Sequence, residues 1–268
     1  MKFALIDGEK EEATKGATAL CQFCGLELIA KCGEIKIHHW AHKSKRNCDP
    51  WWENEGEWHR AWKNEFPTEW QEIIHHDENG QKHIADVKTQ SGWTLEFQHS
   101  FLKHEERQSR NYFYKKLVWV IDGTRRKTDI KQFKRMLEES TQLRTNIPII
   151  RASFPDECRL LNEWHNNDSL VFFDFNESEV TEDTMLWFLF PKTLTSSAYL
   201  SPFSRANFIE LFNNDNFDNL YKNTILPIHK EISNGERRQR EANIHNRANT
   251  LSGFDRYLKN KQRRRRRL

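Results

Sequence analysis

Four of the five cysteines lie between residues 21 and 48, and this clustering constrains the fold more than any other feature of the sequence. Cys21 and Cys24 form a Cys-x2-Cys motif, and His39 and His42 follow as a second close pair. Two such pairs can supply the four ligands of a tetrahedral zinc site. We therefore predict a zinc site of Cys21, Cys24, His39 and His42, with Cys48 as the alternative ligand for either histidine.

A closed shell of four protein ligands predicts a structural zinc, since a catalytic zinc keeps an open position. The cysteine count is odd and the spacing does not suggest a disulfide framework, so reduced thiols in a cytoplasmic protein are expected. The sequence contains no apolar run long enough to span a bilayer and no signal-peptide pattern. We expect a zinc-binding N-terminal module over residues 1–50.

Hydrophobic periodicity predicts strands within this module and alternating helices and strands after it. The expected strands cover residues 3–7, 17–20, 69–75, 83–89, 93–98, 116–123, 147–152, 170–175 and 185–190. The expected helices cover residues 53–65, 102–114 and 128–140, and the pattern turns helical after Pro191. This order indicates an α/β core over 51–155, a mixed C-terminal region of unknown role over 156–234, and a basic tail over 235–268.

Acidic residues interrupt two of the predicted strands. Asp86 lies in "IADV", while Glu96 and Gln98 lie on one face of "TLEFQHS". An antiparallel hairpin would bring Asp86 close to Glu96, and paired carboxylates of this kind suit a hard cation such as Mg²⁺ or Mn²⁺. Hydrolysis of phosphodiesters uses such a site, because the metal binds the phosphate and lowers the pKa of the attacking water.

The stretch "ENEGEWHRAWKNEF" at residues 53–66 predicts a helix with an unusual face. Glu55, His59 and Lys63 follow at spacings of four and would lie on the same side. A solvated helix face with Trp58 and Trp62 on its buried side would also explain this pattern. The choice between a functional and a solvated face depends on the motifs around the helix.

Six motifs occur in the order found in the competence protein CoiA-like family. They are the N-terminal motif of "C..C" with "HWAH", the helix containing "EWHRAWK", the strands "ADV" and "EFQHS", the pair Arg110 and Tyr114, and "VWVIDG". The sequence resembles this family over roughly residues 18–123, with Trp40 in place of the phenylalanine of the family's "HFAH". The resemblance implies a restriction-endonuclease-like PD-(D/E)xK core, which is a nuclease fold.

The resemblance also implies roles for individual residues. Asp86 and Glu96 would bind Mg²⁺ or Mn²⁺, and Gln98 stands where the commoner residue is lysine. Glu55, with Glu57 as the competing choice, would be an additional acid near the metal. His59 and Lys63 would complete the catalytic set by contacting the phosphate or orienting water. Lys63 would also supply the charge that glutamine lacks.

The function implied is a metal-dependent DNA nuclease acting in DNA uptake, processing or defence. The alternative is a catalytically degenerate, zinc-containing protein that only binds DNA. Arg110 is a candidate DNA contact, as is the run of arginines at the end of the tail, including Arg263, Arg264 and Arg265. Such a run is expected to be partly disordered and to bind phosphates through counterion release, although it would also serve as a solubilising tail.

Overall fold

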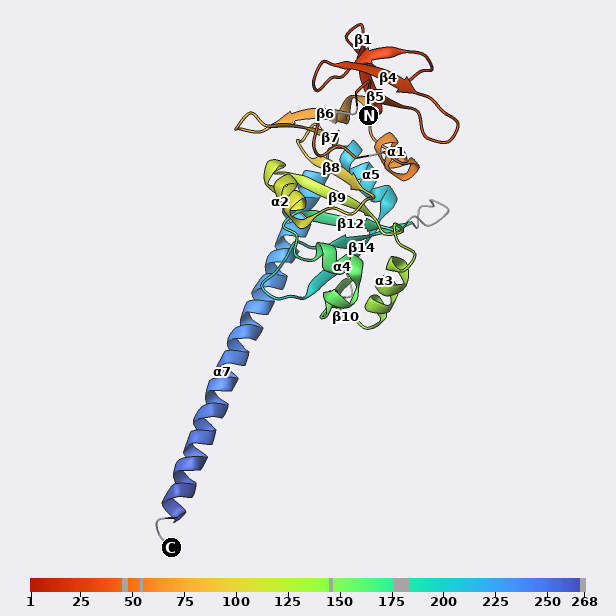
Figure 1. Cartoon of the computed structure of the whole chain (residues 1–268). Helices are drawn as coiled ribbons and strands as arrows, with labels where there is room; N and C mark the ends of the chain where they lie inside the picture. Colours follow the sequence, from red (N-terminus) through yellow and green to blue (C-terminus); the bar gives the residue numbers. More distant parts are fainter. Residues whose placement is uncertain (45–47, 54, 145–146, 176–183, 266–268) are drawn as a thin grey trace.

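The computed structural model describes residues 1–44, 48–53, 55–144, 147–175 and 184–265, and these residues form two β-sheets (Figure 1). The smaller, N-terminal sheet has the strand order β2-β1-β3-β4-β5, and its neighbouring strands are antiparallel. Its strands are β1 (Phe3–Ile6), β2 (Glu9–Glu12), β3 (Thr18–Leu20), β4 (Glu27–Lys31) and β5 (His39–His42). Asp7 and Gly8 both have positive φ angles, as a tight two-residue hairpin turn between β1 and β2 requires.

The larger sheet has nine strands in the order β10-β11-β14-β13-β12-β9-β8-β7-β6. Its strands are β6 (Gln71–His76), β7 (Lys82–Lys88), β8 (Thr94–Gln98), β9 (Leu117–Asp122), β10 (Thr141–Arg144), β11 (Ile149–Ala152), β12 (Leu170–Asp174), β13 (Met185–Leu189) and β14 (Ala198–Ser204). The parallel neighbours are β8, β9 and β12, and the other pairs are antiparallel. The sheet continues across residue 155, where the sequence suggests a boundary.

Helices cover both faces of the nine-stranded sheet. Side chains of β9 alternate between two cores: Val118 and Val120 pack on one side, and Trp119 and Ile121 on the other. The first core includes residues of α1 (Glu57–Asn64), α5 (Arg205–Asn213), α6 (Phe217–Leu220) and α7 (Leu226–Arg265). The second includes residues of α2 (His104–Phe113), α3 (Asp129–Glu138) and α4 (Arg159–Trp164). The expected central, doubly covered strand at residues 116–123 is therefore confirmed.

Two expectations differ from the structure. The stretch 198–204, expected to be helical, forms β14 and pairs with β11 and β13. The first helix, expected from residue 53, begins at Glu57 after an extended Gly56, so Glu55 precedes it. Glycine disfavours helix interiors and is accepted at a helix start, which accounts for the later beginning.

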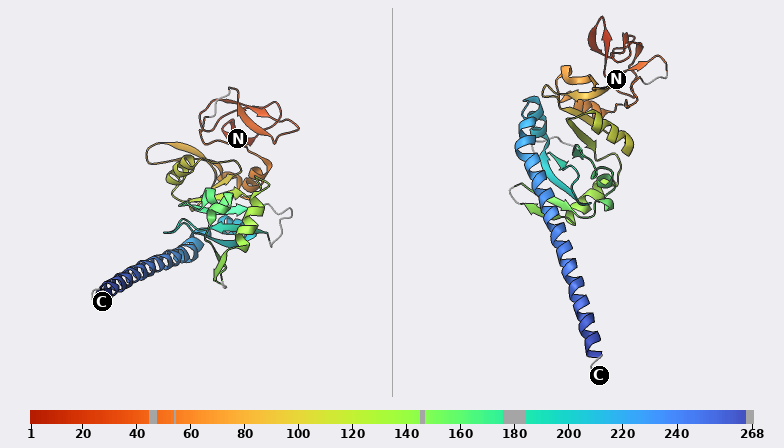
Figure 2. Two further views of the ribbon diagram at one scale, coloured as in Figure 1. Left: turned by 60° about the horizontal axis from the view of Figure 1, so that its bottom comes forward. Right: turned by 90° about the vertical axis from the view of Figure 1, so that its left-hand side faces the viewer.

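The basic tail is helical through Arg265, not disordered as expected. The π-helical turn η3 (Tyr221–Ile225) joins α6 to α7, with the Leu226 N–H bonded to the Tyr221 carbonyl. Pro227 follows, and its ring would clash with a regular helical turn, so the wider turn accommodates it. The helix then leaves the core as a long projection that ends in Arg263, Arg264 and Arg265 (Figure 2). None of the described helices is long and apolar enough to cross a membrane.

The buried carboxylate of Glu236 fixes the first part of α7 to the sheet. It accepts hydrogen bonds from the backbone N–H groups of Leu194 and Thr195, at 2.9 and 3.1 Å, and from the Tyr199 hydroxyl at 2.8 Å. Burial opposes ionisation, but the hydrogen bonds from Thr195 and Tyr199 outweigh it and lower the pKa of Glu236.

Replacement of Glu236 with alanine should lower the free energy of unfolding by about 3 kcal/mol at neutral pH, because buried donors lose their acceptor. Since the pKa of Glu236 is lowered on folding, this contribution is present above the unfolded glutamate pKa of about 4.3 and is lost as the pH falls below it. Urea unfolding at several pH values measures the difference. The exposed Glu241→Ala is the matched control, and an equal loss in both variants would contradict this role.

Candidate functional site

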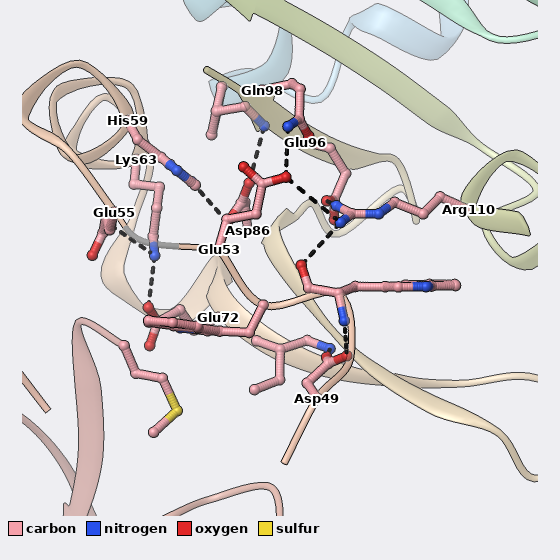
Figure 3. A pocket seen from close by; sticks show the side chains of 15 residues that line it. Asp49, Glu53, Glu55, His59, Lys63, Glu72, Asp86, Glu96, Gln98 and Arg110 are labelled. Atoms are coloured by element: carbon pink, nitrogen blue, oxygen red, sulfur yellow. Dashed lines mark hydrogen bonds and ion pairs between the residues drawn. The ribbon is translucent and has the colours of Figure 1, made fainter. Parts of the chain in front are cut away.

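A small acidic pocket lies where α1, the strands β6 to β8 and α2 meet, below the N-terminal sheet (Figures 1 and 3). Its cavity is about 50 Å³, enough for an ion and a few waters. Helix α1 supplies His59 and Lys63, and α2 supplies Arg110. Six carboxylates line the pocket: Asp49, Glu53, Glu55, Glu72, Asp86 and Glu96.

The strand register brings Asp86 and Glu96 together. Val87 of β7 pairs with Leu95 of β8, so the neighbouring residues Asp86 and Glu96 lie opposite each other on the antiparallel strands. The Phe97 N–H donates to Asp86 Oδ2 at 2.9 Å, and both carboxylates face the pocket (Figure 3). This is the arrangement that the predicted hairpin implied.

Asp86 is ionised and held by His59. The His59 Nε2 atom lies 2.9 Å from Asp86 Oδ1. Burial opposes ionisation of Asp86, but His59 and then Lys63 outweigh it, so the pKa of Asp86 is lowered. Helix α1 therefore orients this carboxylate through His59, a residue expected from the sequence to contact the phosphate or orient water.

Glu96 has one oxygen without a partner. Its Oε2 accepts a hydrogen bond from Arg110 at 3.1 Å, while its buried Oε1 has no hydrogen-bond partner among the described residues. Burial, and next the negative charge of Asp86, raise the pKa of Glu96 to about 8 despite the nearby Arg110. A cation between Asp86 and Glu96 would relieve both effects, because it neutralises the repulsion and supplies the missing partner.

Lys63 is buried on the other side of the pocket. Its Nζ lies 3.1 Å from Glu55 and 2.7 Å from Glu72 (Figure 3). These two carboxylates outweigh the cost of burial and raise the pKa of Lys63. The positive charge of Lys63 is therefore paired with two carboxylates within the fold. Glu55 also pairs with Arg60 at 2.6 Å.

Gln98 and Arg110 are likewise held by other residues of the pocket. Gln98 Nε2 donates to Glu53 Oε1 at 2.6 Å and to Ser100. Arg110, a candidate DNA contact, is only 4% exposed and donates to Glu96, to Glu106 and to the Trp51 carbonyl. Its side chain therefore holds Glu96 within the pocket and does not extend into solvent.

The partners of the six carboxylates separate structural acids from potential ligands. Asp49 accepts from His83 and from the backbone N–H groups of Trp51 and Ile84. Glu72 accepts from Lys63 and from the N–H groups of Lys2 and Phe3. Asp86 and Glu96, the two acids predicted to bind a divalent cation, are contacted instead by His59 and Arg110.

Sequence reasoning did not identify Asp49, Glu53 and Glu72 as site residues. Glu72 has a positive φ of 49°, rare for a residue with a side chain, and its carboxylate binds the N-terminal sheet. These contacts join segments far apart in the chain, so no local pattern signals them. Only the acid-rich composition of residues 53–57 gave a hint for Glu53.

A second cluster, in the N-terminal module, has the geometry of a metal site. The ligand atoms of Cys21, Cys24, His42 and Cys48 all lie within 4.8 Å of one another. Cys21 and Cys48 sulfurs are 3.7 Å apart, and Cys24 Sγ lies 3.2 Å from His42 Nε2. Two sulfurs bound to one zinc at 2.3 Å would be about 3.8 Å apart, so the donor set fits zinc. All five cysteines are free of disulfides.

The structure corrects one predicted ligand, because Cys48 takes the place given to His39. Residues 39 and 42 belong to strand β5, where positions three apart point to opposite faces. His42 faces the cysteines, while His39 faces away and contacts the Ile37 carbonyl through Nδ1 at 2.9 Å. The prediction of two ligands from one His-x2-His pair requires a helix or a turn, which this segment does not form.

Comparison with known proteins identifies the N-terminal module. Residues 6–50 match the family model described as "Competence protein CoiA, N-terminal domain". The match includes strands β2 to β5 and the cysteine cluster, and it confirms the predicted resemblance to the CoiA family at the "C..C" and "HWAH" motifs. No curated protein and no solved structure matches the chain.

The purified protein should contain one zinc ion per chain. Cys48→Ser should lose the zinc and lower the melting temperature, because metal binding and folding are coupled. His39→Ala, an exchange on the opposite face of β5, should keep both. Elemental analysis and thermal unfolding distinguish the two variants, and zinc loss in His39→Ala with retention in Cys48→Ser would contradict the assigned ligands.

Proposed function

We propose that the protein is a divalent-metal-dependent DNA nuclease with a PD-(D/E)xK-type core. The order α1-β6-β7-β8-α2-β9, with β8 and β9 parallel, supports this core. The single observation that carries the proposal is the pair Asp86 and Glu96, which face each other in an enclosed pocket with one carboxylate oxygen of Glu96 unpartnered. The name of the matched family adds a role in competence, hence in DNA uptake or processing.

The residues of the pocket have distinct tasks in this proposal. Asp86 and Glu96 hold the Mg²⁺ or Mn²⁺ ion, which when bound polarises the scissile phosphate and lowers the pKa of water. His59 orients Asp86, and Arg110 orients Glu96. Glu55 and Lys63 keep the adjoining side of the pocket charge-balanced, so the metal is the cation nearest the phosphate.

The zinc site would be structural in this scheme. Three thiolates and one imidazole close the coordination shell and leave no position for substrate. The site holds together the loop segments around β5 and residue 48, immediately before the pocket residues Asp49 and Trp51.

A second function, DNA binding without cleavage, is favoured because the side chains expected to act beside the metal are already paired with other residues of the pocket. Gln98 occupies the usual lysine position and donates to Glu53 and Ser100. Lys63, the expected substitute, is buried between two carboxylates. If a free cation beside the metal is essential for stabilising the transition state, cleavage would be slow or absent.

Asp86→Asn should reduce the DNA cleavage rate on the order of 100-fold or more, corresponding to ~3 kcal/mol, because it removes a metal ligand. The assay compares single- and double-stranded DNA with Mg²⁺ and Mn²⁺. Asp168→Asn, an exposed exchange, is the matched control. Circular dichroism confirms that both variants are folded.

Two outcomes decide between the candidate functions. A folded Asp86→Asn that cleaves as fast as the parent would remove Asp86 from the mechanism. A parent that cleaves no DNA with either ion, yet binds it, would establish the binding-only function.

A further inference from the structure

A second cavity, of about 300 Å³, opens beside the acidic pocket. The two cavities share the lining residues Met1, Trp52 and Glu55, so they are adjacent. We call this second cavity the entrance groove. It lies between the loop that connects β4 to β5 and the start of α1, and its functional side chains are Lys36, His39, Trp52, Glu57 and His99.

We propose that the entrance groove binds a single DNA strand and leads it to the acidic pocket. This inference rests on the proposed nuclease function and adds the form of the substrate. The Asp86 side chain is 19% exposed and that of Glu96 is 6% exposed, inside a cavity of about 50 Å³. The groove of about 300 Å³ that adjoins this pocket can accept part of one strand, whereas a duplex would also have to place its partner strand there.

Trp52 provides a stacking surface at the junction of the two cavities. It is partly buried against the N-terminal module and lines both the groove and the pocket. Aromatic side chains beside a nucleic-acid channel stack on bases without sequence preference, since every base has a π-face. A strand whose base stacks on Trp52 would therefore have its phosphate next to the acidic pocket.

Lys36 supplies positive charge to the groove, and His99 lines it with an oriented imidazole. His99 is 58% exposed and its Nδ1 lies 2.6 Å from the buried Asp122. The other oxygen of Asp122 accepts from the N–H and hydroxyl of Thr124, so this carboxylate is fixed and sets the orientation of the imidazole. Lys36 is exposed on the facing loop. The two side chains reach the groove from different segments of the chain.

The groove also contains acidic residues, so the effect of charge on DNA binding can be tested by removing either a positive or a negative charge. Glu55 is compensated by Arg60 and Lys63. Glu57 is exposed at the start of α1 and opposes a phosphate strand. Arg60 also donates to the His38 carbonyl at 3.3 Å, which ties the loop to α1 and holds the groove open in one geometry. Preorganisation of this kind favours binding.

The test measures binding of a short, fluorescein-labelled oligothymidine and of a duplex by fluorescence anisotropy. The zinc-loaded, full-length protein is used with Ca²⁺ in place of Mg²⁺, so that cleavage cannot destroy the probe. Trp52→Ala should raise the Kd for the single strand about fivefold or more. Lys36→Ala should weaken binding and reduce the slope of log K against log salt by about 0.7. Glu57→Gln should tighten it.

Matched controls lie on α2 and at the residue that precedes it, outside the groove. Tyr112→Ala, at an 83% exposed aromatic residue, and Lys103→Ala should leave the Kd unchanged. Because Trp52 also packs on the N-terminal module, Trp52→Phe tests stacking with less effect on folding. Partial recovery of affinity in Trp52→Phe supports the proposal.

Unchanged single-strand binding in Lys36→Ala, Glu57→Gln and a folded Trp52→Phe or Trp52→Ala would overturn the proposal. Tighter binding of the duplex, with the same dependence on these residues, would also overturn it. These outcomes can be distinguished from those that would refute the proposed nuclease activity. A parent that binds through the groove and never cleaves keeps this inference, and one that cleaves without using the groove refutes it alone.

Discussion

The buried ammonium group of Lys63 is the interaction on which the arrangement of the pocket depends. It pairs with Glu55, which precedes α1, and with Glu72 of β6. Glu72 also accepts the backbone N–H groups of Lys2 and Phe3, so the same carboxylate anchors the N-terminal sheet. Through these contacts, Lys63 links the helix, the large sheet and the N-terminal module. Removing one partner of such a buried ion pair costs about 3–5 kcal/mol, because it leaves a buried charge without compensation.

This network divides the acidic pocket into a balanced side and an unbalanced side. Lys63 and Arg60 pair with Glu55 and Glu72, whereas His59 pairs with Asp86 and Arg110 pairs with Glu96. The raised pKa of Glu96, caused by burial and by Asp86, is the physical sign of this imbalance. A metal ion would complete the charge balance where the protein side chains do not, and the entrance groove adjoins the pocket at Trp52.

Local sequence patterns predicted the parts of the site that depend on local structure. The hairpin of β7 and β8, with Asp86 opposite Glu96, follows from alternation and turn residues. The helix start at Glu57 was missed, yet Glu55 still contacts Lys63. The role of Glu72 and the parallel pairing of β12 with β9 depend on contacts distant in the chain. The choice of His39 over Cys48 failed because ligand spacing was assigned without knowing that residues 39–42 form a strand.

The central claim is that Asp86 and Glu96 form a divalent-cation site that the fold leaves incomplete. Titration of the zinc-loaded protein with Mn²⁺, followed by electron paramagnetic resonance of the free ion, tests it directly. The account predicts one Mn²⁺ bound per chain in the parent and affinity reduced about tenfold or more, ~1.4 kcal/mol, in a folded Glu96→Gln variant. Equal Mn²⁺ affinity in the two proteins, or no Mn²⁺ bound by the parent, would contradict it.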